Sequence, residues 1–206
     1  MADENHLRRL RQGANEFNRW RAVNHVTEPD LSGADLHGLN CSKCDLKNAN
    51  LSQANLEKAN LTRSNLFQAN LTNARLAEAE LEEANFCEAD LSGADLSQVS
   101  AAKAHFTKAT LRDVNLGSAL LGHAKIDAAT LDATDLSHAK LEHARLSDAS
   151  LTRVRAAHAS LSNAVLTDIH VRDSEFDQSN CTNARFNSAD LHKTTFAGAV
   201  LNGSEF

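Results

Sequence analysis

The sequence predicts an all-β solenoid built from four-sided coils, and three observations support this fold class. A leucine recurs at every fifth position, as in the run NANLSQANLEKANL of residues 48–61. An alanine stands two residues before most of these leucines, and the phenylalanines that replace leucine recur at intervals of 20 residues. An α-helix buries residues with a period near 3.6 and a strand with a period of 2, so neither explains a repeat of five.

The repeat register is unbroken from Leu31 to Phe206. When every fifth residue is taken as the centre of a repeat, there are 36 centres, of which 24 are Leu and 6 are Phe, and 23 have Ala two residues earlier. Residues two apart on an extended chain point to the same side, so the Ala and the centre face one interior. The next centre faces that interior only if the chain bends between repeats, and repeated bending produces a stack of coils.

The phenylalanine centres indicate how many sides each coil has. Phe86 and Phe106 are 20 residues apart, and so are Phe176 and Phe196. Twenty residues are four repeats, so a four-sided coil places these rings above one another, whereas a three-sided coil separates them. The 36 repeats then form about nine coils.

The repeat sequence also resembles a known family. Segments such as ANLSQANLEKANLTRSNLFQANL and ADLSGADLSQ follow the pattern A(D/N)LXX, and residues 30–206 resemble the pentapeptide-repeat proteins. The resemblance implies a right-handed quadrilateral β-helix. At the roughly 4.8 Å spacing of stacked strands, nine coils make a column about 43 Å long.

The segment before the repeats is expected to cover one end of the solenoid. We expect an α-helical cap over residues 1–28 and the β-helix over residues 29–206, with Pro29 separating the two. A solenoid end exposes apolar centres and unpaired strand groups, which a cap covers. A helix that docks a partner is the alternative. Four apolar residues lie at helical spacing in LRRLRQGANEFNRW: Leu7, Leu10, Ala14 and Phe17.

Composition excludes several classes of protein. The net charge of −6 and the pI near 5.9 argue against a general nucleic-acid binder, which relies on excess Lys and Arg, so no direct nucleic-acid binding is expected. No apolar run is long enough to span a membrane, and the opening MADENHLRRLRQG does not resemble a secretory signal. A cytoplasmic location is expected.

No catalytic constellation, cofactor or metal site is expected, so the protein is predicted not to be an enzyme. The CSKC motif has the spacing of half a zinc site, but its Cys41 is a repeat centre and its Cys44 takes the inward Ala position, so both are predicted to pack in the core. Cys181 is likewise a centre. His138 and His158, one coil apart, are a metal pair or surface residues, and surface residues are the favoured interpretation.

The outer surface changes character along the chain. The residue before each centre is Asp or Asn in 12 of 14 repeats from 30 to 95 but in only 4 of 22 from 100 to 205. In the later part, six basic or histidine side chains are predicted to gather in two adjacent columns. We name them the basic ridge and expect either a surface for an anionic or acidic partner or an ordinary charge ladder with Glu83, Asp127 and Asp148. The charge ladder is the favoured interpretation from the sequence. The ridge comprises Lys103, His105, His123, Lys125, His143 and Arg145.

Two functions are compatible with these features. The first is a non-enzymatic scaffold that presents flat β-helix faces to a protein partner of unknown identity. The second is implied by the family resemblance: a DNA mimic that binds a type II topoisomerase (gyrase) and modulates it or protects it from quinolones. Residues 25–206 hold 16 Lys and Arg against 24 Asp and Glu, a net charge of −8. Duplex DNA carries roughly 25 negative charges over such a length, so the scaffold is preferred.

The last coil is expected to join two copies of the chain. It places Phe196, Leu201 and Phe206 at centres and Val200 on the outside, and an uncovered coil exposes apolar side chains and unpaired strand groups. A two-fold axis at this end covers the same patch on both subunits. The resemblance also implies dimers of this kind, so a homodimer through the C-terminal coil is predicted.

Overall fold

Each five-residue repeat bends the chain through one corner. Every fifth residue from Gly33 to Gly203 has a positive φ, between 49° and 71°. In most repeats the next residue donates its N–H to the C=O of the centre, as Ala34 does to Leu31 at 3.1 Å. A positive φ at the third residue of a hydrogen-bonded turn is typical of a type II turn. The bend that the sequence pattern requires is therefore made by one left-handed residue per repeat.

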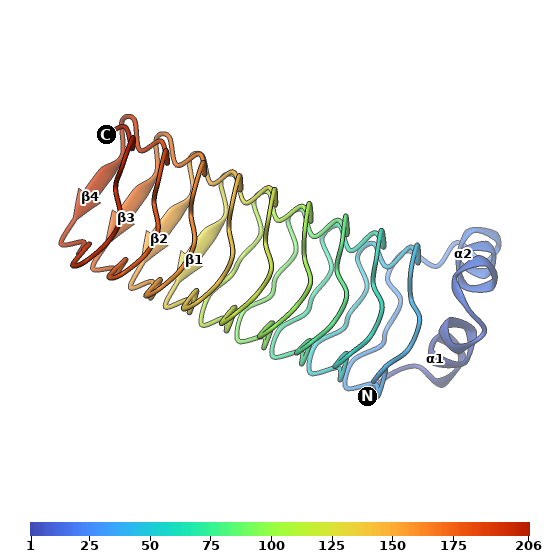
Figure 1. The fold of residues 1–206 in the computed structure, drawn as a ribbon. Coiled ribbons are helices and arrows are strands. Elements are labelled where there is room, and N and C mark those ends of the chain that lie inside the picture. The colour runs from blue at the N-terminus through green and yellow to red at the C-terminus, as the bar shows by residue number, and fades with distance from the viewer.

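Four such corners close a coil, and successive coils stack in parallel register. The computed structural model describes residues 1–206 as a rod of coils with two helices at one end (Figure 1). Each residue before a centre is bridged to the residue 20 positions later, from Asp30 with Asn50 to Arg185 with Glu205. The predicted four-sided solenoid is confirmed.

One side of the later coils is regular enough to form a parallel sheet. Its strands, in the order β1-β2-β3-β4, keep the 20-residue register, with Leu131 opposite Leu151. On the other sides the pairing is limited to single bridges at each repeat. The strands are β1 (Thr130–Asp132), β2 (Ser150–Thr152), β3 (His170–Arg172) and β4 (Asp190–His192).

The interior is one continuous column of side chains. The centres from Leu31 to Phe186 are buried, and so are Cys41, Cys44 and Cys181, as predicted. The rings of Phe86 and Phe106 stack with centroids 5.0 Å apart and planes 6° apart. Phenylalanines one coil apart therefore lie above one another, as the 20-residue spacing predicts.

Asn and Asp before the centres in the first coils have a structural role. The Asn55 side-chain amide donates to the Asp35 carboxylate at 3.0 Å, and Asn65 donates to Asp45 at the same distance. Asn50 Oδ1 also accepts the backbone N–H of Ser52, two residues on, at 3.1 Å. Such side chains bond both to the coil below and to their own turn, which explains their abundance at this position.

The cap consists of two helices rather than the single helix that the sequence pattern suggested. Helix α1 spans Glu4–Arg11, and helix α2 spans Ala14–Val23. Gly13 lies between them with a φ of 98°, a conformation that only glycine adopts readily and that ends a helix. Four apolar side chains of the pair are buried against the first coil: Leu7, Leu10, Phe17 and Trp20. Neither helix has the length and apolar character needed to cross a membrane.

Two polar side chains of α2 bond directly to the open edge of the first coil. The Arg21 guanidinium is buried and donates to the C=O groups of Asp45 and Lys47, and to two C=O groups of the segment after α2. Asn18 accepts the N–H of Asp45 at 2.8 Å. Burial lowers the pKa of Arg21, and the nearby Asp45 carboxylate opposes that shift. These residues replace the strand groups of a preceding coil.

We expect Arg21→Ala to lower the free energy of unfolding by about 3 kcal/mol, because it leaves four partly buried C=O groups without a donor. Urea denaturation followed by circular dichroism measures the loss. Arg19→Ala is the matched control, because Arg19 is exposed on the same helix, and its expected change is within about 0.5 kcal/mol. Equal losses in the two variants would contradict the role given to Arg21.

Candidate functional site: the basic ridge

The basic ridge lies along one corner of the rod and on the side that follows it. Lys103, His123 and His143 occupy the corner, each with a φ of 59°, so their side chains project from successive turns. His105 is bridged to Lys125, and Lys125 to Arg145, on the adjacent side. The structure thus brings the six predicted residues together in two columns.

Stacking fixes the two histidines of the corner. The rings of His123 and His143 lie with centroids 4.8 Å apart and planes 4° apart. Both side chains are exposed, as are those of Lys103, Lys125 and Arg145, whereas His105 is half-buried. The ridge therefore presents five accessible side chains at the spacing of the coils, on a backbone held by ladder hydrogen bonds.

The ridge is only partly neutralised by acidic neighbours. Arg145 Nε lies 3.3 Å from Asp127 Oδ2, and Asp127 is one of the predicted flanking acids. Lys103 and Lys125 form no ion pair. Glu83 instead binds Arg63 at 2.8 Å, which lowers the pKa of Glu83, with a smaller contribution from Lys103. Two lysines of the ridge thus keep their charge available to an outside group.

His105 differs from the other members of the ridge. Its pKa is lowered, first because the ring is partly buried and second because the Lys125 charge lies beside it. Both effects favour the neutral imidazole, which can accept or donate a hydrogen bond but adds no charge. His105 therefore adds a hydrogen-bonding group to the ridge rather than a positive charge.

The remaining predicted chemistry groups do not assemble into a site. His138 and His158 stack at 4.9 Å on a different corner, with no third ligand that would make a metal site. A hydrogen bond with Cys44, together with burial, raises the pKa of Cys41 well above its ordinary value, so this thiol stays protonated. The CSKC pair is core packing.

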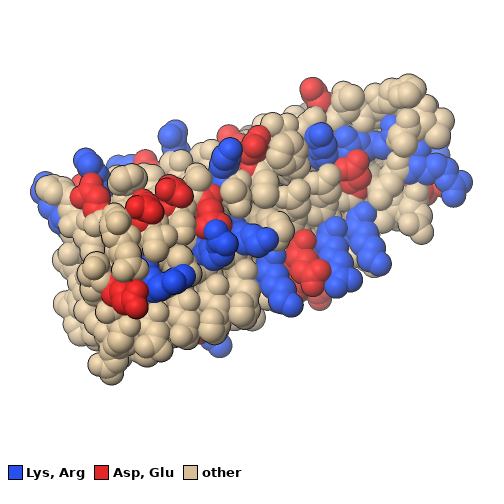
Figure 2. Space-filling model, turned by 90° about the horizontal axis from the view of Figure 1, so that it is seen from above, with Lys and Arg blue, Asp and Glu red and all other residues tan.

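Charge on the rod is mixed rather than uniformly acidic. Figure 2 shows one face on which blue Lys and Arg side chains alternate with red Asp and Glu side chains. Several of these form ladders between coils, such as Lys58 with Glu78 at 3.6 Å and Arg155 with Asp135 at 2.8 Å. Acids in both the early and the later coils are thus partly neutralised by basic neighbours.

The last coil is the most exposed apolar part of the rod. Phe206 is 61% exposed, Val200 45% and Leu201 37%, whereas centres in the middle of the rod are fully buried. Phe196 is half-buried between Phe176, which it stacks on at 5.2 Å, and Phe206, which it meets edge-on. The residues predicted for an interface between subunits therefore lie on one open end.

The fold defines a repeat protein whose short repeats each form one side of a coil. A model of pentapeptide repeats matches eight copies over residues 30–66, 64–100, 89–127, 129–168 and 169–206. The chain belongs to the pentapeptide-repeat family. A search among curated proteins finds no match.

Solved structures of the same family resemble the chain. A trypsin-treated form of QnrB1, a plasmid-mediated fluoroquinolone resistance protein, is 17% identical over 85% of this chain and 87% of its own, with a TM-score of 0.63. HetL of the cyanobacterium Nostoc, a protein involved in regulating heterocyst differentiation, is 26% identical over 94% of both chains, with a TM-score of 0.46. A protein of the Arabidopsis thaliana thylakoid lumen is 33% identical over 46% of this chain and 67% of its own, with a TM-score of 0.44. At 17% identity, the likeness to QnrB1 shows a common fold.

Proposed function

We propose that the chain is a non-enzymatic interaction scaffold that binds an acidic segment of a protein partner on the basic ridge. The observation that carries the proposal concerns three cations on a net acidic protein. Lys125 stacks one coil from Arg145, Lys103 lies on the adjacent corner, and neither lysine has an ion-pair partner. Like charges at this spacing repel one another, so a surface that needs only solubility gains nothing from the arrangement. An anionic partner removes that repulsion.

The backbone beneath the ridge supports tight recognition. Lys103 and Lys125 donate backbone N–H groups to the neighbouring coils at 2.9 Å, so the positions from which the side chains project are ordered before binding. Binding to an ordered surface avoids the entropy cost of folding a loop. Charge complementarity adds a faster association rate and discrimination against basic proteins.

Replacement of Lys125 and Arg145 by Glu is expected to weaken binding of a fluorescein-labelled decaglutamate peptide at least tenfold, because two attractive charges become repulsive. Fluorescence anisotropy at low salt measures the affinity. The unfolding free energy is expected to change by less than about 1 kcal/mol, since both side chains are exposed.

The matched control is the double variant Lys108→Glu, Lys140→Glu, which makes the same change in net charge at positions outside the two columns of the ridge. Both lysines are exposed and form no ion pair. If this control loses as much affinity as the ridge variant, the binding follows net charge and the ridge is an ordinary charged surface.

A second candidate is a DNA mimic that binds gyrase. The observation that favours it is a group of acids in the early coils at positions 78, 80, 82, 83 and 88, together with the fold shared with a fluoroquinolone resistance protein. Against it, Lys58 binds Glu78 and Arg63 binds Glu83, so part of that charge is neutralised. The scaffold therefore remains the preferred function.

A supercoiling assay with purified gyrase separates the two candidates. We expect neither inhibition nor protection from ciprofloxacin at micromolar protein, because the net charge of −8 over residues 25–206 is about a third of that of DNA of the same length. Inhibition or drug protection that is lost in the variant Glu80→Lys, Glu82→Lys would favour the DNA mimic and overturn the scaffold.

We also propose that two copies of the chain join through the last coil. Phe206, Leu201 and Val200 offer an exposed apolar surface next to unpaired strand groups, and a second copy supplies the same surface in return. The two-fold arrangement closes the assembly at a dimer. Elsewhere on the rod, Leu120 is the one large apolar side chain that is exposed, and it stands alone.

Sedimentation equilibrium is expected to give twice the chain mass of 22.3 kDa, and Val200→Arg is expected to restore the single mass because it places a charge in the joint. Val200 is exposed in the single chain, so the variant leaves the core intact. Leu120→Arg is the matched control, as Leu120 is 42% exposed on the side of the rod. A single mass for the unmodified chain at all micromolar concentrations would contradict the dimer.

A further inference from the structure

The cap covers the four sides of the first coil unequally. Within the rod, each side offers three backbone groups to the preceding coil. For example, Asn60 donates its N–H to Leu39, and the C=O groups of Asn60 and Thr62 accept from Cys41 and Lys43. In the first coil, the equivalent groups face the cap, which supplies partners to some sides and not to others.

The side at Asp45 has all three partners. Asn18 accepts the Asp45 N–H, and Arg21 donates to the C=O groups of Asp45 and Lys47. The sides at Asp30 and Asp35 are partly covered: Asp30 bonds to Asp3 and His6, and the Asp35 C=O accepts from Arg11.

The side at Asn40 has none of the three partners. No group of the chain bonds to the Asn40 N–H, to the Asn40 C=O or to the Ser42 C=O. The Asn40 side chain is occupied with its own turn, because its Oδ1 accepts the N–H of Ser42 at 3.0 Å. This is an unpaired strand edge of the kind to which extended chains add.

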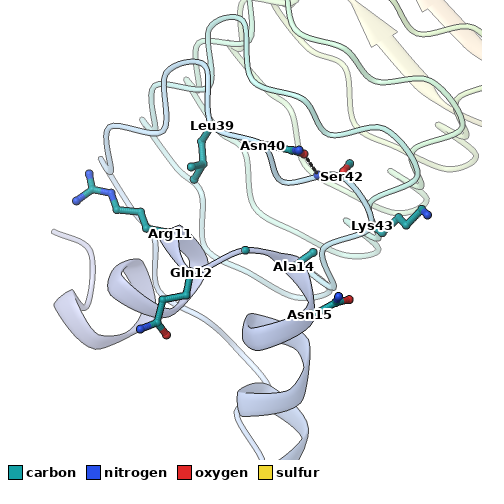
Figure 3. Close-up of a pocket in the computed structure, with 9 residues that line it drawn as sticks. Arg11, Gln12, Ala14, Asn15, Leu39, Asn40, Ser42 and Lys43 are labelled. Atoms are coloured by element: carbon teal, nitrogen blue, oxygen red, sulfur yellow. Dashed lines mark hydrogen bonds between the residues drawn. The ribbon is translucent and has the colours of Figure 1, made fainter.

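A cavity of about 460 Å³ lies directly in front of this edge. Figure 3 shows the segment 39–43 facing the break between α1 and α2, with Gln12 and Asn15 on the two sides of the break. Arg11 and Lys43 supply positive charge to the lining, which contains no acidic residue. Helix α2 begins here, and Gly13 gives it no side-chain cap.

We propose that an acidic, extended peptide segment of a partner protein binds here as an added parallel strand on Asn40–Ser42. Its main chain forms the same three hydrogen bonds that join neighbouring coils of the rod. The C=O of the first peptide residue accepts the Asn40 N–H. The N–H of the third residue donates to the Asn40 C=O, and the N–H of the fifth residue donates to the Ser42 C=O. A five-residue segment spans these groups.

The chemistry of the unpaired groups selects a peptide over a small anion. Two of the three groups are C=O acceptors, which need donors, and an ionised carboxylate offers acceptors only. A peptide main chain supplies one acceptor and two donors in the required order. The cationic lining, with Lys43 and Arg11, the uncapped start of α2 and no opposing acid, then favours acidic side chains on that peptide.

The site is independent of the basic ridge. Lys43 lies on the same corner of the rod as Lys103 but three coils away, at the cap end. Binding at the strand edge depends on main-chain bonds, whereas binding at the ridge depends on side-chain charge. Variants at one site therefore leave the other unchanged, and a failure of one proposal does not affect the other.

The probe is a fluorescein-labelled peptide with the sequence Ala-Asp-Ala-Ser-Glu, amidated at its C-terminus. Its small residues take the inward positions, and in the parallel register its Glu lies beside Lys43. The expected result is saturable binding to the full chain, at least tenfold weaker when the central Ala is N-methylated, because that residue donates to Asn40. Lys43→Glu is expected to weaken binding by the same factor, whereas the control Lys108→Glu leaves it unchanged.

Hydrogen exchange gives a direct readout of strand addition. At saturating peptide the Asn40 amide is expected to exchange at least tenfold more slowly, whereas the Asn60 amide, already bonded to Leu39, keeps its rate. Three outcomes would overturn the proposal: no saturable binding at millimolar peptide, equal binding of the N-methylated peptide, or equal protection of Asn40 by free glutamate. The last of these indicates an anion site rather than a peptide site.

Discussion

The left-handed residue at every fifth position is the constraint on which the whole rod depends. For residues other than glycine this conformation costs roughly 1–2 kcal/mol, and Lys, Glu, His and Arg all adopt it here. The conformation persists because the corner residue also donates its N–H to the next coil, as Lys43 does to Thr62. Each corner is therefore held by its neighbour, and the structure forms as a stack rather than as separate turns.

The outer surface is free to vary in sequence, because interior side chains and backbone hydrogen bonds hold the coils together. The centres and the small residues before them fill the interior, and backbone groups join the coils, so the corner and the residue before each centre tolerate most side chains. Asn and Asp ladders add support in the early coils, as between Asn55 and Asp35. Replacing them in later coils by residues such as Lys125 and Arg145 lowers the stability of the fold little. These positions can therefore carry residues that bind a partner.

Both ends of the rod have backbone strand groups without a neighbouring coil, and the two ends cover these groups differently. Every coil has strand groups on both faces, so an end coil lacks partners on one face. At the N-terminal end, Arg21 and Asn18 bond the side at Asp45 fully, while the side at Asn40 stays open. At the other end, Val200 and Phe206 are exposed beside an open edge. Both open edges are places where another chain can add, which links the fold to the proposed interactions.

The sequence by itself determined everything that follows from the five-residue period. A register without insertions places each residue above the one 20 positions earlier. The four-sided coil, the buried Cys41 and the stacked rings of Phe86 and Phe106 all follow from this register. The register also predicts the two columns of the basic ridge, including the stacked His123 and His143.

Only the tertiary structure decided what lies outside that period. The cap has no repeat to count, so the break at Gly13 and the burial of Arg21 depend on how two helices fit one coil. The repeat register also did not predict that Glu83 pairs with Arg63 rather than with Lys103. A side chain between two cations takes the partner that its rotamer reaches. The open edge at Asn40 was also outside the repeat pattern, because it depends on where the break between α1 and α2 faces the first coil.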